Sequence, residues 1–170
     1  MGNPAASVTM IEYASATCPH CAAFHVNILP SVKKEYIDTG KVKFIFREFP
    51  LDSLALGVSM LTRCLPEAKF FDVTEEFFRT QETWARAQNP EAEITKITTK
   101  AGMDKSTFDA CISNQEMAKS MVEYSRKSGK DFAIKGTPAV FLNGVAMDDV
   151  RELAKVRSAI DAALSGSSAN

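Results

Sequence analysis

The sequence predicts an α/β fold in which a central mixed sheet is interrupted along the chain by a long helical segment. A strand, a helix and a second strand follow one another over residues 7–49. No convincing strand occurs from Asp52 to about Gly129, and strand character returns at Ala139. Two strands joined through a crossover helix run parallel, so we expect the first two strands of this chain to be parallel.

The length and charge of the chain fit a globular protein. It has 170 residues and a formal net charge of −1, which points to neither nucleic acid nor an anionic membrane as a partner. No apolar run approaches the roughly 18 to 20 residues that span a bilayer. The start, Met1–Pro4, lacks the basic and apolar segments of a secretory signal, so we expect a mature form without its signal peptide.

The first strand is predicted over Ser7–Tyr13. A helix is expected over Pro19–Asp38, because proline is well tolerated in the first helical turn. Pro30 should kink this helix. Its apolar residues recur at helical spacing: Phe24, Ile28, Leu29 and Val32. A second strand follows over Lys41–Phe49, where the apolar residues are crowded enough for a central strand.

The segment from 52 to 129 is predicted to be helical. One helix is expected over Pro66–Thr80. Three residues can cap further helices: Asn89, Asp104 and Asn114. The Phe and Met side chains of this segment fit an ordinary helical core, and the alternative is a Met-rich surface that docks varied peptides.

The chain is predicted to close with a β-hairpin and a helix. Strands over Ala139–Leu142 and Val145–Met147 flank Asn143-Gly144, a pair typical of the two-residue type I′ turn. Asp148 is expected to cap the last helix. The apolar face of that helix carries Val150, Leu153, Val156 and Ile160. The polar tail from Ser165 is expected to fray.

Residues 18 to 21 read Cys-Pro-His-Cys at the predicted start of the first helix. Two thiols at this spacing can form a disulfide, and the helix N-terminus stabilises the first thiolate, which is the reactive species in exchange. The alternative is zinc, for which Cys18 and Cys21 would supply two of four ligands. The only histidines, His20 and His25, lie beside these thiols, and the other cysteines form no short-spaced pair. The pattern therefore favours redox chemistry over a metal site.

Cys64 and Cys111 bring the number of cysteines to four. In an oxidising compartment, a bond between these two is the pairing that leaves Cys18 and Cys21 free to react. Buried free thiols are the alternative.

These residues carry a resemblance to a known family. The strand, the Cys-Pro-His-Cys helix and the later Gly136-Thr137-Pro138 resemble the thioredoxin superfamily, and the helical segment between the two halves is similar to the DsbA family of thiol oxidases. The resemblance covers nearly the whole chain. It implies a thioredoxin fold in two parts, 1–51 and 130–170, with an inserted helical domain at 52–129.

The resemblance implies a role for each residue of the first part of the site. Cys18 corresponds to the exposed nucleophile that forms the mixed disulfide with substrate, and Cys21 to the buried resolving cysteine. Pro19 and His20 lie between them, and the resemblance implies that His20 favours the Cys18 thiolate and so donation of the disulfide. Glu12 corresponds to a buried carboxylate that relays a proton to Cys21, with an exposed strand charge as the alternative.

The resemblance also implies roles for the residues around Pro138. Pro138 corresponds to a cis-proline that packs against the disulfide and, with Gly136 and Thr137, presents backbone to an extended substrate. Thr137 is found in isomerase-type relatives. His25 stands where well-known members carry an acidic residue, so it is an ordinary helix residue or a source of positive potential near the thiols. Members usually begin with an extra edge strand, for which few residues precede Ser7.

The function predicted from these features is a periplasmic thiol:disulfide oxidoreductase that oxidises cysteines of unfolded or partly folded secreted proteins. The resemblance implies reoxidation by a DsbB-like membrane partner and no metal or organic cofactor besides the disulfide of Cys18 and Cys21. A monomer is expected. The alternatives are a disulfide isomerase or reductase, a non-catalytic chaperone or binding domain, and an enzyme acting on glutathione conjugates, against which the two cysteines argue.

Overall fold

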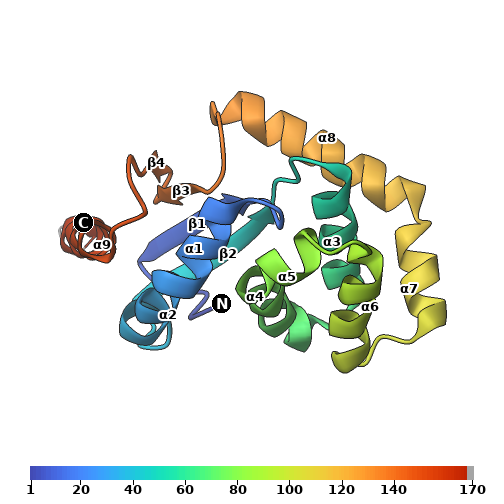
Figure 1. The fold of residues 1–170 in the computed structure, drawn as a ribbon. Helices are drawn as coiled ribbons and strands as arrows, with labels where there is room; N and C mark the ends of the chain where they lie inside the picture. The colour runs from blue at the N-terminus through green and yellow to red at the C-terminus, as the bar shows by residue number, and fades with distance from the viewer. Residues whose placement is uncertain (168–170) are drawn as a thin grey trace.

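The computed structural model describes residues 1–167 and contains the predicted α/β arrangement. The strands are β1 (Val8–Ala14), β2 (Val42–Glu48), β3 (Ala139–Leu142) and β4 (Val145–Ala146). They lie in one sheet in the order β2-β1-β3-β4 (Figure 1). β1 and β2 are parallel, as predicted, and β3 runs antiparallel to both β1 and β4. The sheet is therefore mixed and joins the two ends of the chain.

β1 lies between strands from both ends of the sequence and carries a buried carboxylate. Glu12 pairs with Phe46 of β2 on one side and with Val140 of β3 on the other. Val8, Met10 and Glu12 are fully buried, whereas the residues between them are partly exposed. One face of β1 is thus part of the main core, and Glu12 lies on that face because side chains alternate along a strand.

The helix predicted over Pro19–Asp38 is broken into three pieces. They are α1 (Pro19–Asn27), α2 (Leu29–Val32) and a π-helical turn, η1 (Lys33–Ile37). The break falls at Ile28, just ahead of Pro30, because proline lacks an N–H donor and its ring crowds the preceding turn. The predicted kink is therefore confirmed, and it ends α1 a short distance beyond the Cys-Pro-His-Cys sequence.

The segment between β2 and β3 is helical throughout most of its length. It contains α3 (Ser53–Cys64), the 3₁₀ turn η2 (Glu67–Lys69), α4 (Phe70–Arg79), α5 (Gln81–Ala85), α6 (Pro90–Lys100), α7 (Lys105–Ile112) and α8 (Gln115–Asp131). Asn89, Asp104 and Asn114 cap α6, α7 and α8 as predicted. In Figure 1, α3 to α7 lie together on one side of the strands, and α8 runs back toward β3.

These helices have a core of their own, which also touches the core of the sheet. Trp84 and Phe77 are its largest fully buried side chains. Phe70 and Phe78 of α4 belong instead to the core that includes β1, β2 and α1. α4 therefore packs against α1, and this contact brings the helical segment close to the cysteine pair.

Cys64 and Cys111 form a disulfide that joins the end of α3 to α7. The sequence left either a disulfide or two buried free thiols open for these residues, and the structure contains the disulfide. Cys18 and Cys21 are the free cysteines among residues 1–167.

The closing hairpin forms as predicted. Asn143 and Gly144 both have positive φ, 47° and 85°, the combination that a type I′ turn requires. The second strand is shorter than predicted and ends at Ala146 rather than Met147.

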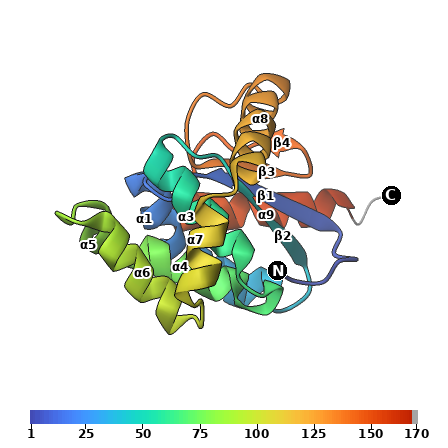
Figure 2. The same cartoon turned by 90° about the vertical axis from the view of Figure 1, so that its right-hand side faces the viewer.

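The last helix, α9 (Leu153–Ser167), begins later than predicted. Asp148 does not cap it, and Val150 is buried in the segment before it. The reason is local: the side chain of Asp149 accepts a hydrogen bond from the backbone N–H of Arg151, which holds this segment in a turn. α9 lies against β1 and β3 (Figure 2). It continues past Ser165, so fraying from that residue is wrong, and residues 168–170 of the predicted tail lie outside the described residues.

The first seven residues contain no strand. Met1 instead lies along the edge of β2, where its amino group donates to the Phe44 carbonyl (2.8 Å) and its carbonyl accepts from the Phe44 N–H (2.9 Å). Within residues 1–167, no helix combines the length and apolar character needed to cross a membrane.

Candidate active site

Cys18 occupies the N-cap of α1, where the loop after β1 enters the helix. Its backbone is extended, and its N–H donates to the carbonyl of Ser15 (3.0 Å). Its Sγ accepts a hydrogen bond from the backbone N–H of Cys21 at 3.4 Å. The first thiol therefore lies where free helix N–H groups and the helix dipole stabilise a negative charge.

Gln81, which the sequence pattern alone did not single out, holds the loop that leads to Cys18. Its buried side-chain amide donates to the carbonyl oxygens of Ala16 (2.7 Å) and Cys18 (3.0 Å). The signal that could have identified it is its place one helical turn after Phe77, because a polar side chain on an apolar face needs internal partners.

The second half of the site is the loop before β3. The peptide bond between Thr137 and Pro138 is cis, which confirms the isomer implied by the resemblance. The Cys18 thiol donates a hydrogen bond to the carbonyl of Thr137 (3.2 Å). Gly136 is exposed and has open space around it. The structure thus brings this loop against Cys18, although the two lie at opposite ends of the chain.

The expectation of an exposed Cys18 is wrong. Cys18 is 6% exposed and Cys21 is fully buried. The loop containing Thr137 lies against the Cys18 sulfur and covers it. The exposed residues at this end of α1 are Pro19 and His20. The accessible surface at this site is therefore formed by Pro19, His20 and the cis-proline loop, and the Cys18 sulfur beneath them is largely covered.

The surroundings of Cys18 lower the pKa of its thiol to about 5. The main cause is a hydrogen bond from the Cys21 thiol, and burial opposes it. The Thr137 hydroxyl and the backbone N–H groups of Cys21 and His20 lower the pKa of Cys18 further. Among the leading causes, His20 contributes through its backbone N–H.

The pKa of the Cys21 thiol is shifted in the opposite direction. Burial is the largest cause that raises the pKa of its thiol, followed by the hydrogen bond with Cys18 and the charge of Glu12. One cysteine is therefore ionised at neutral pH while its neighbour stays protonated. This asymmetry is what a nucleophile and a resolving thiol require.

A buried carboxylate and imidazole lie next to this pair. Glu12 is fully buried and His25 is 5% exposed, and Glu12 Oε2 and His25 Nε2 are 2.9 Å apart. The His25 ring stacks on Phe78, with 4.0 Å between the ring centroids. Glu12 is thus the buried carboxylate that the resemblance implies and not an exposed strand charge. His25 is its hydrogen-bonding partner.

A groove of about 260 Å³ runs beside the cis-proline loop. One wall is formed by α1, including His20 and Phe24, and the loop contributes Thr137 and Pro138. The other wall is the segment 148–151 that precedes α9. The groove offers apolar surface and polar side chains beside the thiol site.

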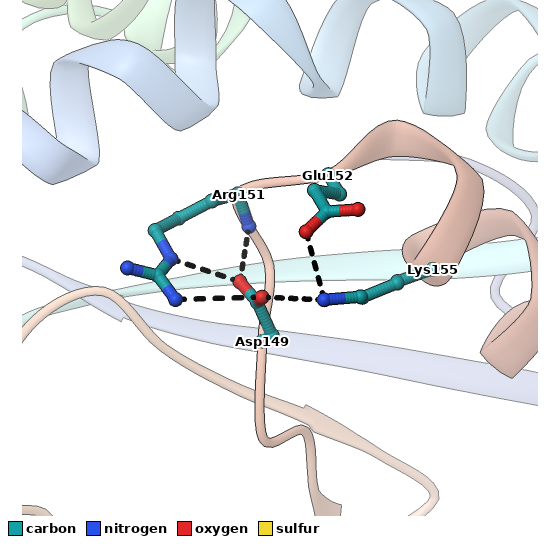
Figure 3. A network of polar contacts seen from close by, with 4 residues as sticks. All are labelled: Asp149, Arg151, Glu152 and Lys155. Atoms are coloured by element: carbon teal, nitrogen blue, oxygen red, sulfur yellow. Dashed lines mark hydrogen bonds and ion pairs between the residues drawn. The ribbon is translucent and has the colours of Figure 1, made fainter.

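An ion-pair network holds the second wall in place (Figure 3). Asp149 accepts hydrogen bonds from the guanidinium and backbone of Arg151 and from Lys155, which also binds Glu152. The hydrogen bonds from Arg151 and Lys155 keep the pKa of Asp149 well below its usual range. Arg151 and Lys155 are exposed, so the network contributes little stability and mainly fixes the shape of the wall.

The zinc alternative lacks ligands. Among residues 1–167, no group of three or more His, Cys, Asp or Glu side chains is placed to hold a metal ion.

Residues 1–162 match the sequence model of the thioredoxin family. The chain belongs to this family. Among solved structures, alpha-DsbA1 from Wolbachia pipientis is similar with a TM-score of 0.91 and 29% identity, covering 98% of this chain and 90% of that chain. BdbD from Bacillus subtilis has a TM-score of 0.85 at 21% identity and covers 97% of this chain and 91% of that chain, which supports the fold alone. The predicted thioredoxin fold and the DsbA-like resemblance are confirmed.

Two relatives of this chain have names that refer to disulfide chemistry. A putative protein-disulfide oxidoreductase of Rickettsia typhi is 30% identical over 165 residues, which are 96% of this chain and 61% of that protein. Disulfide bond formation protein D of Bacillus subtilis is 25% identical over 181 residues, covering 98% of this chain and 77% of that protein. The chain thus spans about three fifths of the length of the rickettsial relative.

Proposed function

We propose that this protein is a thiol:disulfide oxidoreductase that donates a disulfide of Cys18 and Cys21 to cysteines of substrate proteins. The observation that carries the proposal is the low pKa of Cys18, about 5. Lowering the pKa from an ordinary value near 9 stabilises the reduced enzyme at pH 7 by about 3 kcal/mol. For two electrons, this corresponds to about 60 mV toward a more oxidising potential.

The geometry supports an exchange in two steps. A substrate thiolate attacks the Cys18 sulfur of the enzyme disulfide, and the electron pair of the broken bond leaves on Cys21, which takes up a proton. A second substrate thiolate then attacks the substrate sulfur of the mixed disulfide and releases Cys18 as a thiolate. The substrate loses two electrons and two protons; the enzyme gains both electrons and one proton, and the other proton goes to solvent.

The substrate would lie in the groove beside the cis-proline loop. An extended segment there can reach the exposed backbone at Gly136 and the apolar surface of Phe24 and Pro138. We infer cysteine-containing exported proteins as substrates, a periplasmic location, a monomer, and reoxidation by a DsbB-like membrane protein. The family resemblance supports these inferences. No cofactor beyond the disulfide itself enters the proposed exchange.

A disulfide isomerase or reductase is the second candidate. Thr137 before the cis-proline favours it, and a structure described as protein-disulfide isomerase from Novosphingobium aromaticivorans is similar at 27% identity with a TM-score of 0.83. Oxidation of reduced ribonuclease, compared with reactivation of scrambled ribonuclease, separates the two activities. A non-catalytic chaperone would keep its biological activity in the Cys18→Ser variant.

The decisive measurement is the redox equilibrium of the Cys18 and Cys21 pair with glutathione. We expect a potential clearly more oxidising than about −270 mV, the value for thioredoxin. We also expect the Cys18 thiolate to form with a midpoint near pH 5. A potential near that of thioredoxin would contradict the oxidase and favour the reductase.

A further inference from the structure

Gln81 uses both hydrogens of a buried side-chain amide on the loop that leads to Cys18. The amide nitrogen donates to the carbonyl oxygens of Ala16 (2.7 Å) and Cys18 (3.0 Å), which flank Thr17. The side chain is 6% exposed, and its two partners lie 65 and 63 residues earlier in the chain. An apolar side chain would fill this position more favourably if packing were its only role, so the amide requires a reason.

The amide is presented by a helix that is itself anchored in the helical core. Gln81 begins α5, and Trp84 lies one turn later and is fully buried. The Trp84 indole donates to the carbonyl of Phe77 on α4 (2.7 Å), and the two rings meet edge to face with 5.7 Å between their centroids. Gln81 is therefore held in place by α4 and α5, and the loop before Cys18 fits against it.

The bond to the Cys18 carbonyl acts on the residue that carries the reactive sulfur. This carbonyl also accepts the first hydrogen bond of α1, from the N–H of Ala22 (3.1 Å), so Gln81 occupies its second lone pair. The negative end of the carbonyl dipole opposes a negative charge on the sulfur of the same residue, and a donor on this oxygen reduces that opposition. The bond also restrains the backbone from which Sγ of Cys18 faces the N–H of Cys21 (3.4 Å).

A second hydrogen bond joins the helical segment to the same loop without touching Cys18. The Thr17 hydroxyl donates to Asp52 Oδ2 (2.6 Å), and Asp52 Oδ1 caps α3 by accepting from the N–H of Ala55 (2.7 Å). Both Gln81 and Asp52 therefore restrain the loop. Of the two, Gln81 is the one that bonds the Cys18 backbone.

We propose that Gln81 is a positioning residue for thiol–disulfide exchange: its amide holds the Cys18 backbone and stabilises the Cys18 thiolate through the carbonyl of that residue. The proposal rests on the function proposed above and places one determinant of Cys18 reactivity in the inserted helices. It applies to the step that releases substrate. The bond between the substrate sulfur and the Cys18 sulfur breaks, its electron pair leaves on Cys18, and a more stable thiolate is a better leaving group.

The test compares Gln81→Met with Thr17→Val. Gln81→Met keeps the length of the side chain and removes both N–H donors, whereas Thr17→Val removes the bond to Asp52 and leaves the Cys18 carbonyl bonded. The Cys18 thiolate is titrated by its absorbance, and the redox equilibrium with glutathione is measured at pH 7. Urea unfolding of the reduced proteins establishes that each variant is folded.

We expect the midpoint of Cys18 ionisation to rise from near pH 5 by about half a unit to one unit in Gln81→Met, the effect of losing one neutral hydrogen bond. Because pH 7 lies above both midpoints, the glutathione equilibrium should move about three- to tenfold toward the enzyme disulfide, by the same factor as the ionisation. Thr17→Val should keep the wild-type midpoint and equilibrium. Gln81→Asn keeps the amide but is one methylene shorter and cannot reach both carbonyls, so its midpoint should rise as well.

Two results would overturn the role of Gln81. One is a wild-type midpoint in folded Gln81→Met; the other is an equal rise in Thr17→Val, which would mean that any loosening of the loop has this effect. If Gln81→Met does not fold, Gln81→Asn is compared with Thr17→Val in the same way. The shift is a difference between variants and does not depend on the potential of the wild-type protein. A wild-type potential near that of thioredoxin would therefore contradict the proposed function and still leave the role of Gln81 measurable.

Discussion

At the scale of single residues, the two thiols differ because they occupy different positions on the same helix. Cys18 lies before the first turn and faces free N–H groups, whereas Cys21 lies inside the helix next to a buried carboxylate. The tetrapeptide and the helix start could be predicted from the sequence. The covering of Cys18 could not, because it depends on Thr137, which only the folded sheet brings near.

The contribution of His20 can be separated into backbone and side chain. His20→Pro removes the backbone N–H that lowers the pKa of Cys18, so we expect the pKa to rise above 5 by up to about one unit and the potential to become less oxidising. His20→Ala keeps that N–H and should change the pKa much less. Absorbance of the thiolate near 240 nm, followed against pH, measures both. Equal shifts in the two variants would assign the effect to the imidazole instead.

The Thr137 hydroxyl is the second contribution that can be isolated. It is buried, makes no hydrogen bond within the described residues, and is one of the groups that lower the pKa of Cys18. Thr137→Val keeps the shape and removes the donor, so the pKa of Cys18 should rise by about one unit. Thr137→Ser should stay close to wild type. Thr17→Val serves as a control, because the Thr17 hydroxyl donates to Asp52 and not to Cys18. An unchanged thiolate titration in Thr137→Val would contradict this role.

At the scale of elements, helix ends decide where the predictions succeed. Asn89, Asp104 and Asn114 cap their helices because a short polar side chain beside a helix N-terminus satisfies its free N–H groups. Asp148 is also a short polar residue, but it caps no helix. The side chain of the neighbouring Asp149 accepts a hydrogen bond from the backbone N–H of Arg151 and closes a turn before α9 begins. Two adjacent aspartates cannot be ranked by sequence pattern alone.

The loop between β1 and α1 depends on α5 through one side chain. Gln81→Leu would remove the side-chain donor to the Ala16 carbonyl, whereas the Cys18 carbonyl would keep the backbone N–H of Ala22 (3.1 Å), so we expect a loss of about 1 to 3 kcal/mol in the free energy of unfolding. Urea denaturation of the reduced protein measures it. Gln88→Leu, at an exposed position after α5, should change stability by less than about 0.5 kcal/mol. An equal loss of unfolding free energy in Gln81→Leu and Gln88→Leu would mean that the hydrogen bonds from Gln81 to the loop do not stabilise the fold.

At the scale of the whole molecule, the site joins segments from both ends of the chain and from the helical insertion. The cysteines come from α1, Pro138 from the loop before β3, and Gln81 and Phe78 from the helices between. The Cys-Pro-His-Cys motif identifies the cysteines, and the family resemblance identifies Pro138. Gln81 and Phe78 are long-range partners that only the packing of the helices brings to the site, so the sequence alone could not reveal them.

The depressed pKa of Cys18 also links folding to pH. A group whose pKa is lower in the folded protein stabilises it fully above the ordinary pKa, near 9, and this stabilisation is lost as the pH falls toward 5. Between pH 7 and pH 5, the reduced protein should therefore lose about 2 to 3 kcal/mol of unfolding free energy that Cys18→Ser does not lose. Urea unfolding of both proteins across this range measures the difference. Parallel pH curves would show that Cys18 is not ionised in the native state.

We expect the disulfide of Cys64 and Cys111 to stabilise the fold and to leave the thiol chemistry of Cys18 unchanged. It closes a loop between residues 47 apart and lies in the helical core, away from the core that contains Cys18. Chain entropy gives such a loop a stabilisation of up to about 4 kcal/mol. Cys64→Ala/Cys111→Ala should therefore lower the free energy of unfolding by up to that amount, while the Cys18 thiolate midpoint stays near pH 5. A shift in that midpoint would mean that the helical segment and the thiol site are coupled through α4, whose Phe78 stacks on His25.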